Sequence, residues 1–256
     1  MHLQRWGGGR IGRMRLFVDL PLAPGAAFAL PPAAARHAQV RRAQPGDALV
    51  LFDGRGGEWP SVVVSMGRTE VQVCVQHHDA VERESALPVM LAVGMPANER
   101  MDWLVEKATE LGAVAIQPLH CERSVLRLDS ERAERKRTHW QAVAVAAAEQ
   151  SGRTRVPVLH PARNLRQWLA QPLPAGPRWL LSLAPGAAAP QHLSPPAQAV
   201  VLSGPEGGLT AEEAAAARAA GFVDISLGER VLRADTAPLA ALAWLVLTCW
   251  GPSATG

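Results

Sequence analysis

The sequence predicts a two-domain protein in which a small antiparallel β-barrel precedes an α/β domain with a mostly parallel sheet. Two observations lead to this fold class. Up to about residue 80, short apolar runs rich in β-branched residues alternate with turn sequences such as Pro45-Gly46-Asp47. From Val89 onward, strand-like runs alternate with longer helical patterns, which is typical of a parallel sheet covered by helices.

The first domain is expected to span residues 14–80. Its strand candidates are residues 15–20, 48–52, 59–65 and 71–76. Residues 1–13 are rich in glycine and arginine and have no apolar core, so we expect a frayed extension and no signal peptide. The polar segment from Asp79 to Pro88 is interpreted as the linker to the second domain.

The second domain is expected to span residues 89–252. Its strand candidates are residues 89–93, 114–119, 180–183, 199–203 and 225–227. Helical spacing predicts a first helix that Asn98 caps and that ends at Gly112. A long helix is predicted over residues 130–150, ended by Gly152.

Two further helices have clear amino-terminal signals. Thr210 and Glu213 match the capping-box pattern, and the helix they open ends near Gly221. Asp235 and Thr236 can cap the last helix. Each of these helices follows a loop that contains glycine, and these loops carry the functional argument below.

The composition excludes several classes of protein. Hydrophobic residues make up 48% of the chain, which is enough for a substantial core. The three cysteines are widely spaced without a CxxC pair, which argues against disulfides or zinc and favours a reducing compartment. The longest apolar run, residues 237–250, is too short to span a bilayer. We therefore expect a cytoplasmic protein without a metal site or a membrane association.

Two glycine-bearing loops are the strongest functional signal. The segment 204–208 (GPEGG) joins an apolar run to a capped helix, and residues 226–237 repeat this arrangement about twenty residues later. Glycine permits close backbone approach and helix N-termini expose N–H donors, so the loops could build one ligand pocket. The alternative is a pair of tight turns without a ligand, and spacing alone favours neither.

The loop chemistry limits the ligand. The segment matches neither GxGxxG nor a phosphate-binding P-loop. Pro205 removes an N–H donor and Glu206 would repel a phosphate oxygen, so a triphosphate is disfavoured. A ligand with an adenine, a ribose and a positive centre tolerates Glu206 better.

Several motifs then occur in a specific order along the chain. They are residues 36–37 (RH), 40–42 (VRR), 45–47 (PGD), 100–103 (RMDW), 106–112 (EKATELG), 121–124 (CERS), 146–153 (AAAEQSGR), 204–208 (GPEGG), 227–233 (LGERVLR) and 235–237 (DTA). Together they resemble the 16S ribosomal RNA uracil-N3 methyltransferases, a family of the SPOUT class, over roughly residues 14–250. The chain departs from the family pattern at Asp235, where members usually have glutamate, and at residues 96–98 (PAN), where many carry a lysine.

The resemblance implies a PUA-like β-barrel that contacts RNA, followed by a SPOUT-type α/β domain with a C-terminal trefoil knot. It implies S-adenosyl-L-methionine as cofactor and N3 of a uridine in 16S rRNA of the small ribosomal subunit as the methyl acceptor. It also implies a homodimer. The cofactor-binding residues it indicates are Leu183, Ser203, Gly204, Pro205, Glu206, Gly207, Gly208, Leu227, Gly228, Val231, Leu232, Thr236 and Ala237.

The candidate catalytic residues are Arg233, Arg230 and Glu206. Methylation of uracil N3 removes an imide proton, and arginine can stabilise the resulting anion because it stays charged and presents a planar fork of donors. The alternative for either arginine is a structural ion pair with Glu229 or Asp235. Glu206 could orient the cofactor or act as the base, and a purely structural role is a stronger interpretation than the base role.

Phosphate contacts are expected from arginine clusters. The candidate RNA-binding residues are Arg36, Arg41, Arg42, Arg123, Gln150, Arg153 and Arg155. For any single arginine, a solvated charge is the alternative.

Two other classes of function compete with the methyltransferase. A nucleotide-dependent dehydrogenase is disfavoured because the chain lacks the GxGxxG turn and its acidic ribose ligand. A non-catalytic RNA-binding protein, in which the glycine loops are only turns, stays open.

The last helix is apolar over nearly its whole circumference, from Leu239 to Leu247. A helix of this kind is buried on all sides. Either it packs against its own domain and a partner subunit, or it is internal in a monomer.

Overall fold

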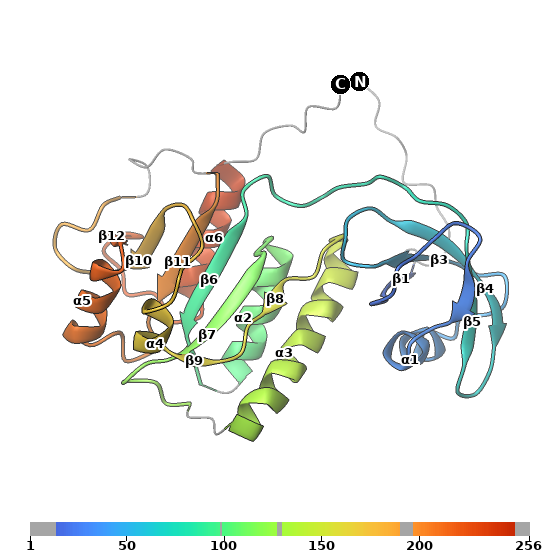
Figure 1. Ribbon diagram of the computed structural model, residues 1–256, viewed down its shortest axis with the longest axis horizontal. Helices are drawn as coiled ribbons and strands as arrows, with labels where there is room; N and C mark the ends of the chain where they lie inside the picture. The colour runs from blue at the N-terminus through green and yellow to red at the C-terminus, as the bar shows by residue number, and fades with distance from the viewer. Residues whose placement is uncertain (1–13, 98, 127–129, 190–196, 249–256) are drawn as a thin grey trace. The chain divides into compact units, whose positions relative to one another are not determined.

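The computed structural model describes residues 14–97, 99–126, 130–189 and 197–248 (Figure 1). Contacts divide the chain into two compact units, Met1–Arg83 and Glu84–Gly256. The predicted cap at Asn98 and the terminal extension lie outside the described residues. Among those described, no helix is long and apolar enough to cross a membrane.

The first unit is built on a five-stranded sheet with the order β1-β3-β4-β5-β2. Its elements are β1 (Met14–Phe17), β2 (Ala27–Ala29), α1 (Pro32–Val40), β3 (Ala48–Phe52), β4 (Trp59–Met66) and β5 (Val71–Val75). The β1–β3 pairing is parallel and the other three pairings are antiparallel, so the prediction of an antiparallel barrel is wrong for β1. Alternate strand residues such as Leu49, Leu51 and Val73 form the core together with Ala34 and Ala38 of α1.

The second unit contains a sheet with the order β12-β10-β11-β6-β7-β8, and β9 also pairs with β7. Its strands are β6 (Val89–Gly94), β7 (Ala115–His120), β8 (Val158–Leu159), β9 (Arg163–Asn164), β10 (Arg178–Leu181), β11 (Ala199–Ser203) and β12 (Phe222–Ile225). Every one of these pairings is parallel. The prediction of a mostly parallel sheet is therefore confirmed.

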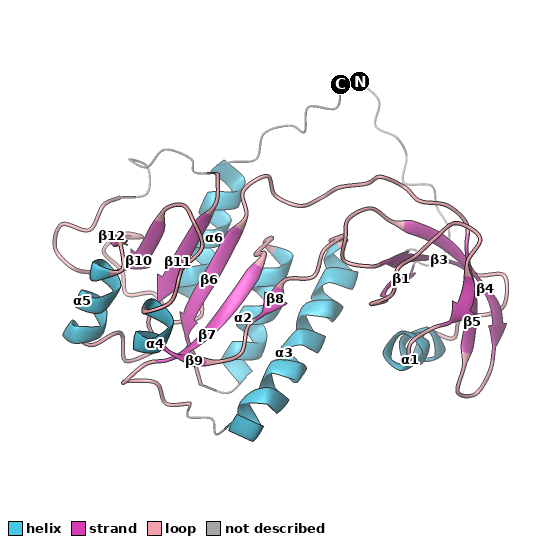
Figure 2. Cartoon of the chain, in the orientation of Figure 1, coloured by secondary structure: helices cyan, strands magenta, loops and turns pink. Residues whose placement is uncertain are grey.

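Helices cover both faces of this sheet (Figure 2). They are α2 (Glu99–Glu110), α3 (Ser130–Ser151), α4 (Leu165–Leu169), α5 (Ala211–Ala219) and α6 (Thr236–Thr248). The side chains of each central strand alternate between the two faces. Val89, Leu91 and Val93 of β6 pack with α2, α3 and α6, whereas Met90 and Ala92 pack with α4 and α5.

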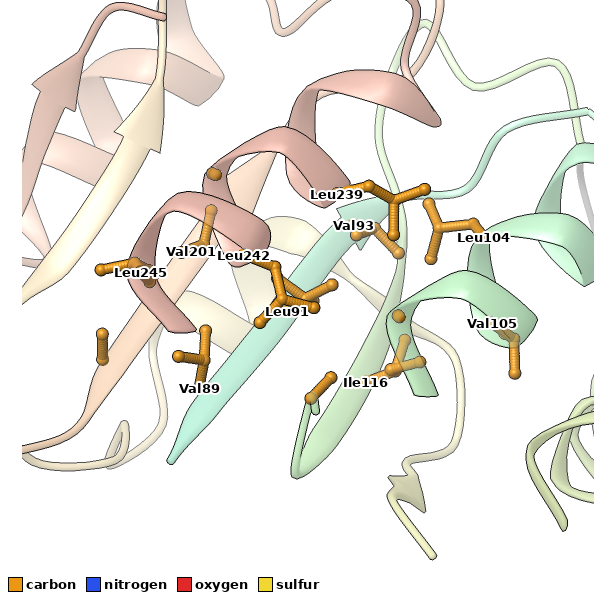
Figure 3. Close-up of a cluster of buried hydrophobic side chains, with 14 of the residues drawn as sticks. Val89, Leu91, Val93, Leu104, Val105, Ile116, Val201, Leu239, Leu242 and Leu245 are labelled. Carbon is orange, nitrogen blue, oxygen red and sulfur yellow. The ribbon is translucent and has the colours of Figure 1, made fainter. Parts of the chain in front are cut away.

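Figure 3 shows the larger of these two cores. Leu239, Leu242 and Leu245 of α6 contact β6 and β11, and Leu104 of α2 packs beside them. Burial of each leucine contributes roughly 1.5–3 kcal/mol relative to exposure. The cluster therefore fixes α6, and with it the segment that leads into α6.

Several elements differ from the prediction. β10 and β12 end two residues earlier than expected, at Leu181 and Ile225, because the chain leaves the sheet there. The sequence analysis missed β2, α1, β8, β9 and α4. The trefoil knot remains a prediction.

Candidate cofactor pocket and active site

A cavity of about 520 Å³ lies at the carboxyl ends of β10, β11 and β12. This edge of a parallel sheet is the usual position of a ligand site, because strand-to-helix loops converge there. The lining residues are Arg100, Leu180, Leu181, Ser182, Leu183, Ser203, Gly204, Pro205, Glu206, Gly208, Leu209, Ala214, Ile225, Leu227, Gly228, Arg230, Val231, Leu232, Arg233, Ala234 and Ala237.

The structure brings together nearly all of the predicted cofactor residues. Gly207 and Thr236 are the two exceptions, since neither lines the cavity. The eight lining residues that the prediction missed are Arg100, Leu180, Leu181, Ser182, Leu209, Ala214, Ile225 and Ala234. Most of them adjoin predicted residues in sequence, but Arg100 comes from α2 and no local loop signal could have indicated it.

Close packing shapes the glycine loop. A Cβ atom at Gly94 would lie 2.5 Å from the backbone nitrogen of Pro205, and one at Gly204 would lie 2.9 Å from that of Leu209. Gly208 and Gly228 adopt positive φ angles of 68° and 107°, a region that side chains disfavour. The glycines therefore let the loop fold back on itself and against the end of β6.

Glu206 connects this loop to the start of α2. Its Oε1 accepts a hydrogen bond of 2.9 Å from the backbone N–H of Ala97 and lies 3.6 Å from Nη1 of Arg100. These contacts support the structural interpretation of Glu206 over its use as a free base. They also hold a carboxylate at the wall of the cavity, where it can face a positive centre.

Arg230 and Arg233 are exposed side chains that line the cavity. Among the described residues, neither forms an ion pair with Glu229 or Asp235. The backbone of Arg233 is fixed, because its carbonyl accepts from the N–H groups of Thr236 and Ala237 at 3.0 Å. Both guanidinium groups are therefore available to an anionic or carbonyl-bearing ligand.

The predicted cap of α6 by Asp235 is not formed through the Oδ1 atom of this residue. Its Oδ1 atom is buried and has no hydrogen-bond partner among the described residues. The predicted capping role of Asp235 is thus not supported at this oxygen.

The donor set of the cavity suits S-adenosylmethionine. Leucines at positions 180, 181, 183, 209, 227 and 232 supply apolar walls for a purine. The hydroxyl of Ser203 is buried and has no hydrogen-bond partner in the part of the chain that the structure describes, so a polar ligand can satisfy it. The carboxylate of Glu206 supplies a negative charge that can face the sulfonium or ammonium group of this ligand.

The predicted RNA-contact residues fall into two groups. Arg36 is exposed within α1, and Arg41 and Arg42 are exposed just after it. Arg123, Gln150 and Arg155 are exposed in the second unit. The guanidinium of Arg123 donates a hydrogen bond of 3.0 Å to the carbonyl of Gly207.

Arg153 requires a correction. Its side chain is buried, pairs with the carboxylate of Glu84, and donates to the carbonyls of Thr109 and Ala113 at 2.9 and 2.8 Å. These donors point into the protein, so the structure gives Arg153 a structural role instead of an RNA contact. Sequence position alone could not separate it from its exposed neighbour Arg155.

The fold and the site together define an α/β protein with a cavity suited to a nucleoside-like ligand at a sheet edge, and with a small β-rich unit. Comparison with protein families is more specific. Residues 83–246 match the RNA methyltransferase domain, and residues 30–75 match the RNA methyltransferase PUA domain. The chain therefore belongs to the RNA methyltransferase family.

Similar proteins agree with this assignment. A curated relative from Synechocystis sp., called ribosomal RNA small subunit methyltransferase E, is 37% identical over 80% of this chain and 67% of its own length. A Legionella pneumophila methyltransferase solved with S-adenosylmethionine superimposes with a TM-score of 0.89 at 30% identity, covering 93% of this chain and 98% of that one. The Neisseria gonorrhoeae ribosomal RNA small subunit methyltransferase E, also bound to S-adenosylmethionine, gives 0.87 and 32% with the same coverage. The predicted α/β methyltransferase fold with a PUA-like domain is confirmed.

Proposed function

We propose that this protein transfers a methyl group from S-adenosylmethionine to N3 of a uridine in 16S rRNA of the small ribosomal subunit. The carrying observation is the cavity itself, in which two glycine loops and the arginines of residues 230–233 meet at one sheet edge. Relatives of similar fold bind S-adenosylmethionine and are named for small-subunit ribosomal RNA. The choice of N3 rests on the motif resemblance and on the chemistry of these arginines.

The proposed reaction needs the chain to stabilise a uracil anion and to align it with the methyl group. The cofactor supplies a methyl group on a positively charged sulfur. N3 of uracil would lose its proton to solvent and form the new N–C bond as the S–C bond breaks, with the electron pair of that bond left on the sulfur. Arg230 and Arg233 stabilise negative charge on the uracil carbonyl oxygens, which favours loss of the imide proton.

Alignment supplies most of the acceleration, because opposite charges are neutralised in the transition state and water must be kept out. The apolar walls of the cavity fit this requirement. Glu206 orients the positive end of the cofactor, and its bond to Ala97 keeps the carboxylate in place.

Arg233→Ala tests the catalytic assignment. We expect the variant to lose methyl transfer by roughly 100-fold to 1,000-fold, since it removes one stabilising donor of the anion. Binding of S-adenosylmethionine, measured by calorimetry, should stay within about threefold of the unchanged protein. Near-normal turnover would remove Arg233 from the mechanism.

Mapping the product tests the proposed function as a whole. Purified small subunits and free 16S rRNA are incubated with labelled S-adenosylmethionine, and the modified nucleotide is located by mass spectrometry. The proposal expects a single uridine that is heavier by one methyl group in place of a hydrogen and whose released nucleoside co-elutes with authentic 3-methyluridine. Label on a different base or on a ribose would contradict it.

The proposed substrate places the enzyme in the cytoplasm, where ribosomal subunits are assembled. We also propose a homodimer. α6 exposes Leu247 and the neighbouring helix α2 exposes Trp103, with 71% and 45% of their surfaces accessible. Large apolar side chains on adjacent helices are suited to a second copy of the chain.

A further inference from the structure

The turn that follows β7 packs against the glycine loop. Nη1 of Arg123 donates to the carbonyl of Gly207 at 3.0 Å. A Cβ atom at Gly207 would come within 2.9 Å of the Cβ of Arg123, so glycine is required for this approach. Gly207 does not line the cavity, but its neighbours Glu206 and Gly208 do. Arg123 therefore contacts the loop at a point away from the cavity wall.

The turn is itself anchored to the protein interior. The backbone N–H of Cys121 donates to Oγ of Ser124 at 3.0 Å, which closes the turn. The N–H of Glu122 donates to Oε1 of Glu213 at 2.8 Å, and the other oxygen of that carboxylate accepts from the N–H of Thr210 at 3.0 Å. Glu213 is only 2% exposed, so one buried carboxylate joins the turn to the start of α5.

These contacts hold the glycine loop at three points. Its beginning packs against Gly94 through Pro205, and its end is fixed where Thr210 meets Glu213. Its middle contains an internal bond of 2.8 Å from the N–H of Gly208 to the carbonyl of Pro205. Arg123 supports this middle portion from the neighbouring turn.

We infer that Arg123 is a positioning residue for the cofactor loop. Its bond to Gly207 keeps Glu206 and Gly208 at the cavity wall, so losing the bond weakens cofactor binding more than RNA binding. This inference rests on the proposed function, because the loop it supports is the proposed cofactor site. It gives Arg123 a role different from the RNA contact expected from sequence.

Local charge could produce a similar effect, and the chain offers a matched control. The backbone N–H of Glu212 and the hydroxyl of Thr210 lower the pKa of the Glu212 carboxyl, and the guanidiniums of Arg166 and Arg123 add to this. Both arginines therefore lie near the same carboxylate. Arg166 donates to Glu122 at 3.0 Å, on the same turn, but has no bond to Gly207.

The experiment compares four full-length variants, Arg123→Met, Arg123→Lys, Arg166→Met and Gly207→Ala. The dissociation constant of S-adenosylmethionine is measured by calorimetry, and KM for cofactor and RNA by initial rates. We expect Arg123→Met to raise the cofactor constants about fivefold to tenfold, consistent with the loss of one hydrogen bond that is exposed to solvent. KM for RNA should change by less than about twofold.

The other variants sharpen the result. Gly207→Ala should also weaken cofactor binding, because the added Cβ atom pushes the loop away from Arg123. The φ angle of Gly207 lies outside the positive range, so alanine adds no backbone strain there. Arg123→Lys should restore part of the cofactor affinity, and Arg166→Met should bind like the unchanged protein. Equal losses in Arg123→Met and Arg166→Met, or a change confined to KM for RNA, would overturn the inference. If the unchanged protein bound no S-adenosylmethionine, the proposed function would fail instead.

Discussion

Arg42 occupies a backbone conformation that glycine usually takes. Its φ angle is 56°, and it follows Arg41, the C-cap residue of α1. The N–H of Arg42 donates to the carbonyl of Gln39, and the N–H of Ala43 donates to the carbonyl of Ala38. This pair of bonds is the Schellman arrangement at a helix end. Arginine in this position costs roughly 1–2 kcal/mol relative to an unstrained residue. A strained, exposed arginine in the unit that matches the PUA domain is suited to the proposed contact with RNA.

Arg42→Gly separates the strain from the contact. We expect the free energy of unfolding to stay the same or rise by up to about 1 kcal/mol, because glycine adopts this conformation without strain but gains entropy when unfolded. RNA affinity should fall, and the slope of log binding constant against log salt concentration should become shallower by about one unit. Arg55→Gly serves as a control at an exposed arginine that was not predicted to bind RNA. Unchanged RNA affinity in Arg42→Gly would contradict the assignment.

Cys121 is expected to be chemically inert. Burial, followed by the nearby Glu213 carboxylate, raises the pKa of its thiol to about 12, although a hydrogen bond with Ser124 opposes the shift. In a variant that retains Cys121 alone, alkylation at pH 8 should be at least about 100-fold slower when folded than when unfolded. Rapid labelling of the folded protein would contradict the burial of the Cys121 thiol.

The same shift has a consequence for stability. Because the folded pKa lies above the ordinary value of 9.0, the native state binds the proton more tightly. The contribution is fully present below pH 9 and is lost as the pH rises toward 12.

At the scale of elements, the sequence predicts helices and central strands well where local signals are strong. The capping box of Thr210 and Glu213 forms as expected, and Gly112 ends α2 with a φ angle of 94°. β11 spans the predicted residues because it is apolar on both faces. Signals of this kind depend on only a few adjacent residues, so they can be found in the sequence.

Errors arose where apolar residues serve the cavity instead of the sheet. Leu183 and Leu227 were predicted to lie in strands, but both follow the last paired residue and line the cavity. Hydrophobicity cannot distinguish a residue that packs in a sheet from one that faces a ligand. β8 was missed because a two-residue strand depends on long-range pairing, whereas α4 has a local signal, the cap at Asn164, that the prediction did not use.

The capping box also makes a prediction. Thr210→Ala removes the hydroxyl that accepts from the N–H of Glu213 at 3.2 Å, so the free energy of unfolding should fall by about 1 kcal/mol. Thr210→Ser keeps the hydroxyl and should lose less than half as much. Chemical denaturation of both variants measures the difference, and equal losses would show that the methyl group, not the cap, is responsible.

At the scale of the whole molecule, the exposed Trp103 of α2 and Leu247 of α6 form the proposed dimer surface. Leu247→Glu places a charge on this surface without touching the buried core of α6. We expect the unchanged protein to sediment as a dimer and the variant to shift toward monomer by at least about tenfold in dissociation constant. Ser65→Glu, at an exposed position in the first unit, is the control. A monomeric unchanged protein would contradict the dimer.

The central claim is that the glycine loops after β11 and β12 hold S-adenosylmethionine. A crystal structure of the protein with this compound tests it most directly. The account predicts electron density for the adenosyl group between the loop that contains Gly204 and the segment that contains Leu232, beside the hydroxyl of Ser203. Density at another site, or loops that fill the cavity with their own side chains, would contradict it.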